Sequence, residues 1–415
     1  METHLADFIR NTSTGREAEE ILRRCVHCGF CTATCPTYQL LGDELDGPRG
    51  RIYLIKQVLE GAEPTEKTRL HLDRCLTCRA CETTCPSGVH YSRLLDIGRA
   101  VVEQKVPRKG SDALMRSALK NVLPRSGLFG AAMKAGQAVR LLLPGALKAK
   151  IPPLSSAGAL PRNVHPRKLI ALAGCAQPSM YPNINGATLR VLDRLGIQMI
   201  EAPGAGCCGA VRFHLNEAEG ARDDARRNID AWWPLIESGV EGLVMTASGC
   251  GVHVRDYAHL LQDDPDYALK AARVALLTRD ISEVIAAEQA QLSALLASCT
   301  SLPEPARPLS FHSPCTLQHG QQIRGVVETL LTSAGYALQP VADSHLCCGS
   351  AGTYSVLQPE ISLRLRENKL NALTAGAPVV IASANIGCMA HLQGGTALPV
   401  RHWIELIDER LSATH

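Results

Sequence analysis

Residues 25–36 read CVHCGFCTATCP, and residues 75–86 repeat the same spacing as CLTCRACETTCP. Each run has three cysteines separated by two residues, then a fourth cysteine after three more residues, followed directly by proline. A pattern of four spaced cysteines and a proline rarely arises by chance, so its recurrence indicates two sites for one kind of ligand. The runs contain Cys25, Cys28, Cys31, Cys35, Cys75, Cys78, Cys81 and Cys85.

Each run is typical of the ligands of a four-iron, four-sulfur (4Fe-4S) cluster in two-cluster ferredoxins, where the fourth cysteine binds the other cluster. We therefore expect Cys25, Cys28, Cys31 and Cys85 to hold one cluster, and Cys75, Cys78, Cys81 and Cys35 to hold the second. This cross-ligation ties the two segments together and keeps the clusters close enough for electron exchange. Structural zinc, which usually takes paired C-x-x-C units, fits in-line cysteines poorly, and a disulfide framework is a further alternative.

The segment between the runs is too long for a compact β-rich ferredoxin. Residues 49–61 place apolar side chains at helical spacing, with Pro48 and Gly61 at positions that suit a helix start and stop. Residues 91–104 carry a similar stripe, and residues 17–24 also favour helix. We expect an α-helical ferredoxin domain over residues 1–105, with each cysteine run in a loop between helices.

The composition favours a multidomain protein with metal-binding thiols. The chain has 415 residues, seventeen cysteines and a formal charge of +3, which predicts two or three domains and no nucleic-acid partner. Residues 1–10 have no apolar core, so we expect no signal peptide and a reducing cytoplasm in which thiolates stay available for metal. No run of 18 apolar residues is present, so we expect no transmembrane helix.

The second half contains a duplicated set of cysteines. Thirty-one residues separate the first cysteine from an adjacent Cys-Cys-Gly in both copies, and 41 or 39 residues then precede the last cysteine. Internal duplication is the simplest explanation. Cys299 lies outside both sets and is given no role. The sets are Cys175, Cys207, Cys208 and Cys250, and Cys315, Cys347, Cys348 and Cys388.

Strands and helices alternate around each set, which predicts parallel α/β lobes over residues 167–300 and 301–415. Every cysteine of the sets follows the carboxyl end of a predicted strand, where open parallel sheets place their ligands. We therefore expect the cysteines to converge within each lobe. The predicted strands are 168–173, 196–201 and 242–246 in the first lobe, and 309–312, 336–341 and 379–382 in the second.

Two other stretches carry weaker signals. Residues 204–209 fit G-x-G-x-x-G after a strand, but the matching loop at 344–349 lacks the first two glycines, so we do not expect nucleotide binding. Residues 106–166 are rich in Gly, Pro, Ala, Lys and Arg and predict a linker. Its basic amphipathic part, 128–150, is either a connector packed on a neighbouring domain or a helix that binds a membrane or a partner.

The chain resembles a known family. The duplicated cysteine, Cys-Cys-Gly and final cysteine resemble the cysteine-rich CCG domain. A two-cluster ferredoxin domain joined to two such lobes resembles the iron–sulfur subunit of glycolate oxidase (glycolate dehydrogenase). Residues 25–61 and 71–89 carry the likeness most closely, although it covers nearly the whole chain. Related arrangements occur in anaerobic glycerol-3-phosphate dehydrogenase, heterodisulfide reductase and lactate-utilisation proteins.

This resemblance implies an electron relay. A partner subunit with FAD would oxidise glycolate to glyoxylate, and electrons would then pass through the clusters of this chain towards a membrane acceptor, a quinone. No catalytic residue is expected here, because substrate chemistry belongs to the partner and the chain has no flavin fingerprint. The expected location is the cytoplasm, peripherally on the inner membrane through the complex.

Each lobe departs from the complete CCG motif, which in heterodisulfide reductase binds a non-cubane cluster with five cysteines. The final C-x-x-C is C-x-x-H here, so His253 and His391 stand in the fifth place. Imidazole can bind iron, as in Rieske centres, which predicts additional metal in the lobes through their cysteines and these histidines. Alternatively, both histidines are ordinary helix residues, and the lobes serve partner docking or form a quinone pocket.

Three functions follow from these features. The first is the electron-transfer subunit of a glycolate-oxidising complex, which the similarity of the first hundred residues favours. The second is the same role with a lactate or glycerol-3-phosphate dehydrogenase. The third is a catalytic subunit like heterodisulfide reductase, and the missing fifth cysteine in each lobe counts against it.

Overall fold

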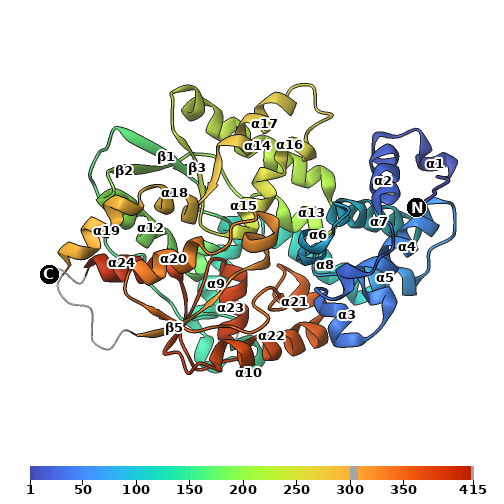
Figure 1. The fold of residues 1–415 in the computed structure, drawn as a ribbon. Coiled ribbons are helices and arrows are strands. Elements are labelled where there is room, and N and C mark those ends of the chain that lie inside the picture. The colour runs from blue at the N-terminus through green and yellow to red at the C-terminus, as the bar shows by residue number, and fades with distance from the viewer. Residues whose placement is uncertain (149, 300–306, 413–415) are drawn as a thin grey trace.

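The computed structural model describes residues 1–148, 150–299 and 307–412. In Figure 1, a helical N-terminal domain lies at one end of the molecule and two α/β lobes make up the rest. Each lobe contains a parallel four-stranded sheet, which confirms the predicted fold class. The predicted boundary between the lobes, at residues 300 and 301, lies outside the described residues.

The N-terminal domain is built from short helices that enclose both cysteine runs. Helix α2 begins after Thr12, whose side chain accepts a hydrogen bond from the Gly15 N–H. Helix α7 approaches α4 closely because Gly98 has no side chain: a Cβ there would lie 2.5 Å from Ile55. The helices are α1 (Asp7–Arg10), α2 (Ser13–Arg24), α3 (Pro36–Leu41), α4 (Pro48–Leu59), α5 (Glu66–Asp73), α6 (Ala80–Thr84) and α7 (Tyr91–Lys105).

The predicted linker is helical over much of its length. Helix α9 packs on α11 (Gln177–Met180) of the first lobe, where the Gln137 amide donates a hydrogen bond to the Ser179 carbonyl at 3.3 Å. Leu141 and Leu142 are 85% and 86% exposed. None of the described helices has the length and apolar character needed to span a bilayer. The linker helices are α8 (Gly110–Val122), α9 (Ser126–Ala138) and α10 (Gly145–Lys148).

The first lobe has the strand order β2-β1-β3-β4, with all neighbours parallel. The chain leaves β1 towards one side and returns to β3 on the other, so the carboxyl ends of β1 and β3 form a topological switch point. Strand β4 was not predicted, because only three residues form it. The strands are β1 (Arg167–Ala171), β2 (Ile197–Glu201), β3 (Gly242–Met245) and β4 (Thr278–Asp280).

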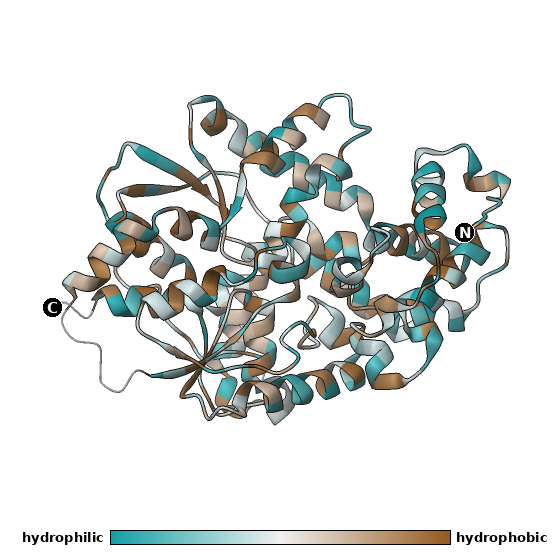
Figure 2. Cartoon of the chain, in the orientation of Figure 1, coloured by the Kyte–Doolittle hydropathy of each residue, from teal (hydrophilic) through white to brown (hydrophobic). Residues whose placement is uncertain are grey.

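Helices cover both faces of this sheet, as its buried strands require. Figure 2 shows hydrophobic residues on the strands and on the inner sides of the surrounding helices. The helices are α11 (Gln177–Met180), α12 (Asn183–Arg194), α13 (Ala210–His214), α14 (Ala218–Glu237), α15 (Ser248–Arg255), α16 (Tyr257–Leu260), α17 (Ala268–Leu277), α18 (Ile281–Ala287) and α19 (Gln289–Ser298).

The second lobe repeats the topology with the order β6-β5-β7-β8. Its second predicted strand, 336–341, is reduced to two residues, and the three-residue β8 was missed for the same reason as β4. The strands are β5 (Pro308–His312), β6 (Ala337–Leu338), β7 (Val380–Ser383) and β8 (Val400–His402). The helices are α20 (Val326–Ser333), α21 (Tyr354–Leu357), α22 (Pro359–Thr374), α23 (Ile386–Gln393) and α24 (Trp403–Ser412).

The two lobes share one hydrophobic core, which runs from Leu169 and Val191 in the first to Phe311 and Trp403 in the second. Helix α12 packs against α24 across this interface. The His402 Nε2 lies 2.9 Å from the Thr246 carbonyl oxygen, at the end of β3. Because the core is continuous, the carboxyl edges of the two sheets are held in a defined relation to each other.

The N-terminal domain packs against both lobes. The Tyr354 hydroxyl of the second lobe donates a hydrogen bond to the Arg74 carbonyl at 3.0 Å. Arg79 pairs with Asp256 of the first lobe at 2.6 Å. Both arginines adjoin the second cysteine run, so this run faces the lobes.

Candidate metal centres

The first cysteine run surrounds a cavity together with one cysteine from the second run. Cys25, Cys28, Cys31 and Cys85 all line this cavity. This is the set assigned to one cluster from the spacing, and the structure brings its four thiols together. Cys81 also reaches the cavity wall.

The second cavity is lined by Cys75, Cys78, Cys81 and Cys35. Cys35 belongs to the first run in sequence, but it stands at the N-terminus of α3, which turns its thiol towards the second run. The crossed arrangement predicted for two-cluster ferredoxins is therefore present in the geometry. The assignment of these thiols as ligands remains a prediction.

The two loops share an unusual backbone conformation. His27 and Gly29 have φ values of 56° and 85°, and Thr77 and Arg79, at the matching positions, have 50° and 61°. A non-glycine residue in this left-handed region costs roughly 1–3 kcal/mol and persists where the surrounding structure enforces it, often at functional sites. These left-handed residues turn the backbone of each loop sharply. In the second loop, the Thr77 N–H donates a hydrogen bond to the Cys75 sulfur at 3.5 Å.

Burial makes the free thiolates of these sites costly. It raises the pKa of the Cys31 thiol to about 11, with the nearby Cys25 adding to the effect. Burial likewise raises the pKa of Cys78 and Cys81 well above that of an ordinary thiol, and Cys315 of the second lobe contributes at Cys78. A bound metal deprotonates coordinating thiols and neutralises their charge. This donor set therefore fits an iron–sulfur cluster.

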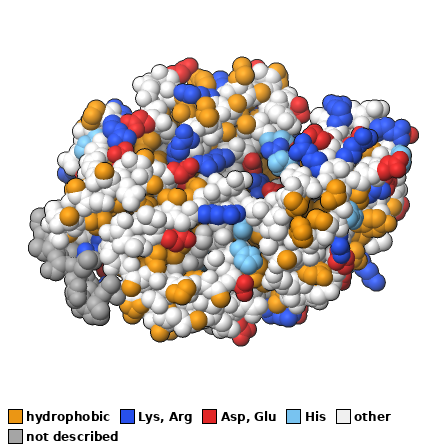
Figure 3. All heavy atoms as spheres, viewed as in Figure 1, with side chains coloured by type: hydrophobic (Ala, Val, Ile, Leu, Met, Phe, Trp, Pro, Cys, Tyr) orange, Lys and Arg blue, Asp and Glu red, His pale blue; other side chains and the backbone are white. Residues whose placement is uncertain are grey.

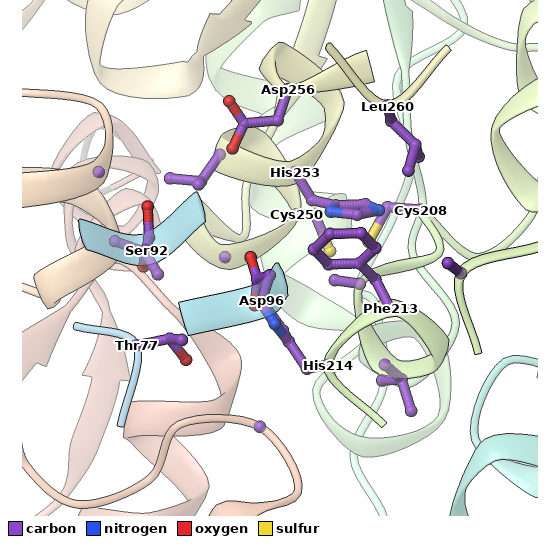
Figure 4. Close-up of a pocket in the computed structure, with 18 of the residues that line it drawn as sticks. Thr77, Ser92, Asp96, Cys208, Phe213, His214, Cys250, His253, Asp256 and Leu260 are labelled. Atoms are coloured by element: carbon purple, nitrogen blue, oxygen red, sulfur yellow. The ribbon is translucent and has the colours of Figure 1, made fainter. Parts of the chain in front are cut away.

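A larger cavity of about 1080 Å³ lies where the three parts of the chain meet. Cys78 of the N-terminal domain opens onto it, as do cysteines of both lobes. Figure 4 shows Cys208, Cys250 and His253 close together in this cavity, with Asp96 among its other lining residues. Burial raises the pKa of the Asp96 carboxyl to about 7. The cavity thus joins the second N-terminal site to the predicted lobe sites.

The cysteines of the first lobe form a row of contacting thiols. The thiols of Cys175 and Cys207, of Cys207 and Cys208, and of Cys208 and Cys250 lie close enough to shift each other's pKa. Interaction with Cys175 and Cys208 lowers the pKa of the Cys207 thiol. The same interactions raise the pKa of the Cys175 and Cys208 thiols. The structure therefore brings these four residues together at the switch point, as predicted.

The second lobe contains an equivalent row. The sulfur of Cys315 lies 3.9 Å from that of Cys347, and the thiols of Cys347 and Cys388 lie close enough to that of Cys348 to shift its pKa. The Asn385 amide donates to the Cys388 sulfur at 3.5 Å. These four cysteines are buried. Cys299, given no role, follows the last residue of α19.

The two predicted histidines differ in their surroundings. His253 is buried beside the first row, and its Nε2 has no hydrogen-bond partner. His391 Nε2 lies 3.3 Å from both the hydroxyl and the carbonyl oxygen of Ser362. Burial lowers the pKa of both imidazoles to about 4, so both are neutral, as metal ligands must be.

Sequence reasoning missed one residue of the second lobe. His312, the last residue of β5, lies with Cys348 and Cys388 in a group whose ligand atoms are all within 4.8 Å of one another. The signal was available in the sequence: the residue three positions before the first cysteine of each set is Leu172 in one lobe and His312 in the other. An apolar strand residue replaced by a histidine marks a change in local chemistry.

Comparisons with known proteins agree with this organisation. Residues 21–89 match the 4Fe-4S dicluster domain family, and residues 170–255 and 309–393 each match the cysteine-rich domain family. The chain is 53% identical to the glycolate oxidase iron-sulfur subunit of Escherichia coli (strain K12) over 99% of both chains.

Two further relatives are more distant. A probable glycolate oxidase iron-sulfur subunit of Bacillus subtilis (strain 168) is 31% identical over 93% of this chain and 92% of its own. Lactate utilization protein A of Exiguobacterium sp. is 25% identical over 57% of this chain and 94% of its own. From the full-length likeness and the arrangement of its cysteines, the chain belongs to the family of glycolate oxidase iron–sulfur subunits.

Proposed function

We propose that this chain is the electron-transfer subunit of a glycolate-oxidising complex. A partner subunit with FAD would oxidise glycolate to glyoxylate, and this chain would carry the electrons towards a quinone at the membrane. The observation that carries the proposal is the pair of crossed four-cysteine cavities, of which the second adjoins the central cavity. The full-length likeness to glycolate oxidase iron–sulfur subunits supports the choice of substrate.

The protein's contribution is to hold, shield and tune the two sites. When bound, a 4Fe-4S cluster accepts and releases one electron at a time. The Tyr91 hydroxyl donates to the Cys75 sulfur at 3.6 Å, and the Thr37 hydroxyl lies 3.3 Å from the Cys35 sulfur. Hydrogen bonds to ligand sulfurs are one way in which a protein sets the potential of a cluster. Both contacts lie at the second site.

The first site supports a role in docking the flavin subunit. Cys28 is exposed, and the apolar side chains of Val26 and Phe30 on the same loop are 69% and 61% exposed. Apolar residues around a redox site allow a partner to approach closely and exclude water. We therefore propose that electrons enter at this loop and leave from the second site.

The second site supports a route into the lobes. Leu76, next to Cys75, packs in one apolar cluster with Cys315, Cys347 and Tyr354 of the second lobe. The second site is thus in direct contact with that lobe's row of thiols. Asp96 in the adjoining cavity is placed to supply a proton, which reduction of a quinone requires, so we propose that the acceptor binds there.

We propose that the complex works in the cytoplasm at the inner membrane, with the membrane contact made through its other subunits. On the face that Figure 3 shows, the Lys, Arg, Asp and Glu side chains are interspersed. Such a surface has no strong field that would attract a polyanion or an acidic membrane.

Two experiments test the proposal. Anaerobically purified chain should contain about eight iron atoms if only the N-terminal sites are filled, and twelve or more if a lobe also holds a cluster, at four irons per cluster. Mixed with its flavin subunit, the chain should be reduced by glycolate and show the EPR signals of reduced clusters. An iron-free chain, or one that lactate or glycerol 3-phosphate reduces while glycolate does not, contradicts the proposal.

A further inference from the structure

The second lobe contains a compact group of potential metal ligands that involves neither predicted histidine. One ring nitrogen of His312 and the sulfurs of Cys348 and Cys388 all lie within 4.8 Å of one another. Ligands around one tetrahedral metal ion are separated by roughly 3.3–3.8 Å, given bonds of about 2.0 Å to nitrogen and 2.3 Å to sulfur. Small side-chain movements would therefore bring these three atoms onto a common metal.

The imidazole of His312 is buried, and its ring nitrogens form no hydrogen bond with the described residues. It is 2% exposed, and neither Nδ1 nor Nε2 has a hydrogen-bond partner among the described residues. Leaving a buried polar group unpaired is unfavourable, and most such groups in proteins find a partner. Coordination to a metal would provide one for this ring.

Comparison of the two lobes shows that packing alone does not require a histidine at position 312. The position of His312, three residues before the first cysteine of the set, is occupied in the first lobe by Leu172, which is buried in an apolar cluster. The strand scaffold therefore accepts an apolar residue here. His391, at the place of the fifth cysteine, instead contacts Ser362.

We propose that the second lobe binds a thiophilic metal through His312, Cys348 and Cys388, with His312 rather than His391 supplying the imidazole. This rests on the prediction, made from the sequence, that the lobe cysteines bind metal. Cys347 contacts Cys348 and is the neighbouring thiol best placed to complete the coordination. The chemistry suits iron in a sulfide-bridged cluster or a single zinc ion, since both take mixed thiolate and imidazole ligands.

The two lobes would then differ in their metal chemistry despite their common fold. In the first lobe, Leu172 removes the corresponding ligand, and His253 is the histidine beside the thiols. If the metal is iron, nitrogen ligation gives the second-lobe centre a higher potential than an all-thiolate centre, as in Rieske proteins. Such a centre beside the second N-terminal site would accept electrons from it.

The test compares His312→Leu with His391→Leu in the full-length chain, purified without oxygen. Leucine is the residue that the first lobe has at this place, so the substitution suits the strand. Iron, zinc and acid-labile sulfide are counted, and EPR of the N-terminal clusters reports that the chain is intact. We expect H312L to lose the metal of one centre, and H391L to keep the full amount. Loss of iron with sulfide identifies a cluster, and loss of zinc alone identifies a single ion.

A second variant covers the case in which H312L fails to fold. His312→Cys supplies another soft ligand, so it should keep the metal while its visible or X-ray absorption spectrum changes. Folded H312L with the metal content and spectrum of the original chain overturns the inference, and so does H312C with an unchanged spectrum. A chain with eight irons and no other metal overturns this inference alone, whereas absence of the N-terminal iron overturns the proposed function.

Discussion

Asp46 is the carboxylate on which the polar interior of the N-terminal domain depends. Its side chain is fully buried, and its oxygens lie 2.7 Å from Arg74, 3.0 Å from His71 Nδ1 and 3.4 Å from Arg51, which is also fully buried. Asp46→Asn keeps the shape of the side chain and removes its charge. The guanidinium of Arg51 would then stay buried and lose its carboxylate partner.

The expected cost follows from these distances. Two unit charges 3.4 Å apart interact by about 5 kcal/mol at an effective dielectric constant of about 20. Removing one partner of a buried ion pair costs about 3–5 kcal/mol in measured cases. With a shift of about 2–4 °C per kcal/mol, the melting temperature should fall by roughly 10 °C. The second site should suffer most, because Arg51, the partner of Asp46, lines its cavity.

Thermal unfolding of anaerobic protein, followed by circular dichroism and by cluster absorbance, measures this loss. The matched control is Glu20→Gln, which removes an exposed ion pair with Arg24 on α2 of the same domain. Exposed pairs of this kind contribute about 0.3–0.5 kcal/mol, so the control should shift the melting temperature by about 1–2 °C. A D46N protein that melts together with E20Q would refute the electrostatic reasoning.

Three further predictions concern the clusters, the docking loop and acid stability. Cys85→Ser should abolish the same EPR signal as Cys28→Ser, because both thiols line one cavity; loss of the other signal instead would exclude cross-ligation. Phe30→Glu should slow reduction by the flavin subunit several-fold and leave the iron content unchanged; an unchanged rate places docking elsewhere. Burial lowers the pKa of His402 to about 4, from about 6.5 in the unfolded chain, so the unfolded state binds more protons and stability falls below pH 6.5. From pH 7 to pH 5 this residue should cost about 2 kcal/mol, measured as the difference in urea midpoint between the original chain and His402→Gln; equal pH dependence in both contradicts it.

Local sequence patterns predicted the elements that local interactions determine. The stripe in residues 49–61 became α4, which begins at Pro48, and the strand residues 242–246 became β3. Strands β4 and β8 escaped prediction because three residues are too few to show a period, and pairing with a neighbouring strand is what makes them strands. The linker helices α8 and α9 are much longer than these strands, so shortness does not explain why they were not predicted. Their Gly- and Ala-rich composition resembles a connector, and contacts such as α9 on α11 stabilise them as helices.

The candidate sites divide in the same way. The spacing of the cysteines was enough to identify the eight N-terminal and the eight duplicated cysteines as candidate ligands, because a ligand run is a pattern along the chain. The switch-point rule then predicted that each duplicated set would converge, since parallel strands end at one edge.

By itself, the sequence determined which residues carry the thiols, that the lobes are copies, and that their cysteines end parallel strands. Only the tertiary structure decided that Cys78 faces the second lobe across a shared cavity, and that His312 adjoins Cys348 and Cys388 while His391 contacts Ser362. The physical reason is that a motif constrains positions a few residues apart. Distances between side chains on separate elements depend on how the helices and sheets pack, and no single stretch of sequence contains that information.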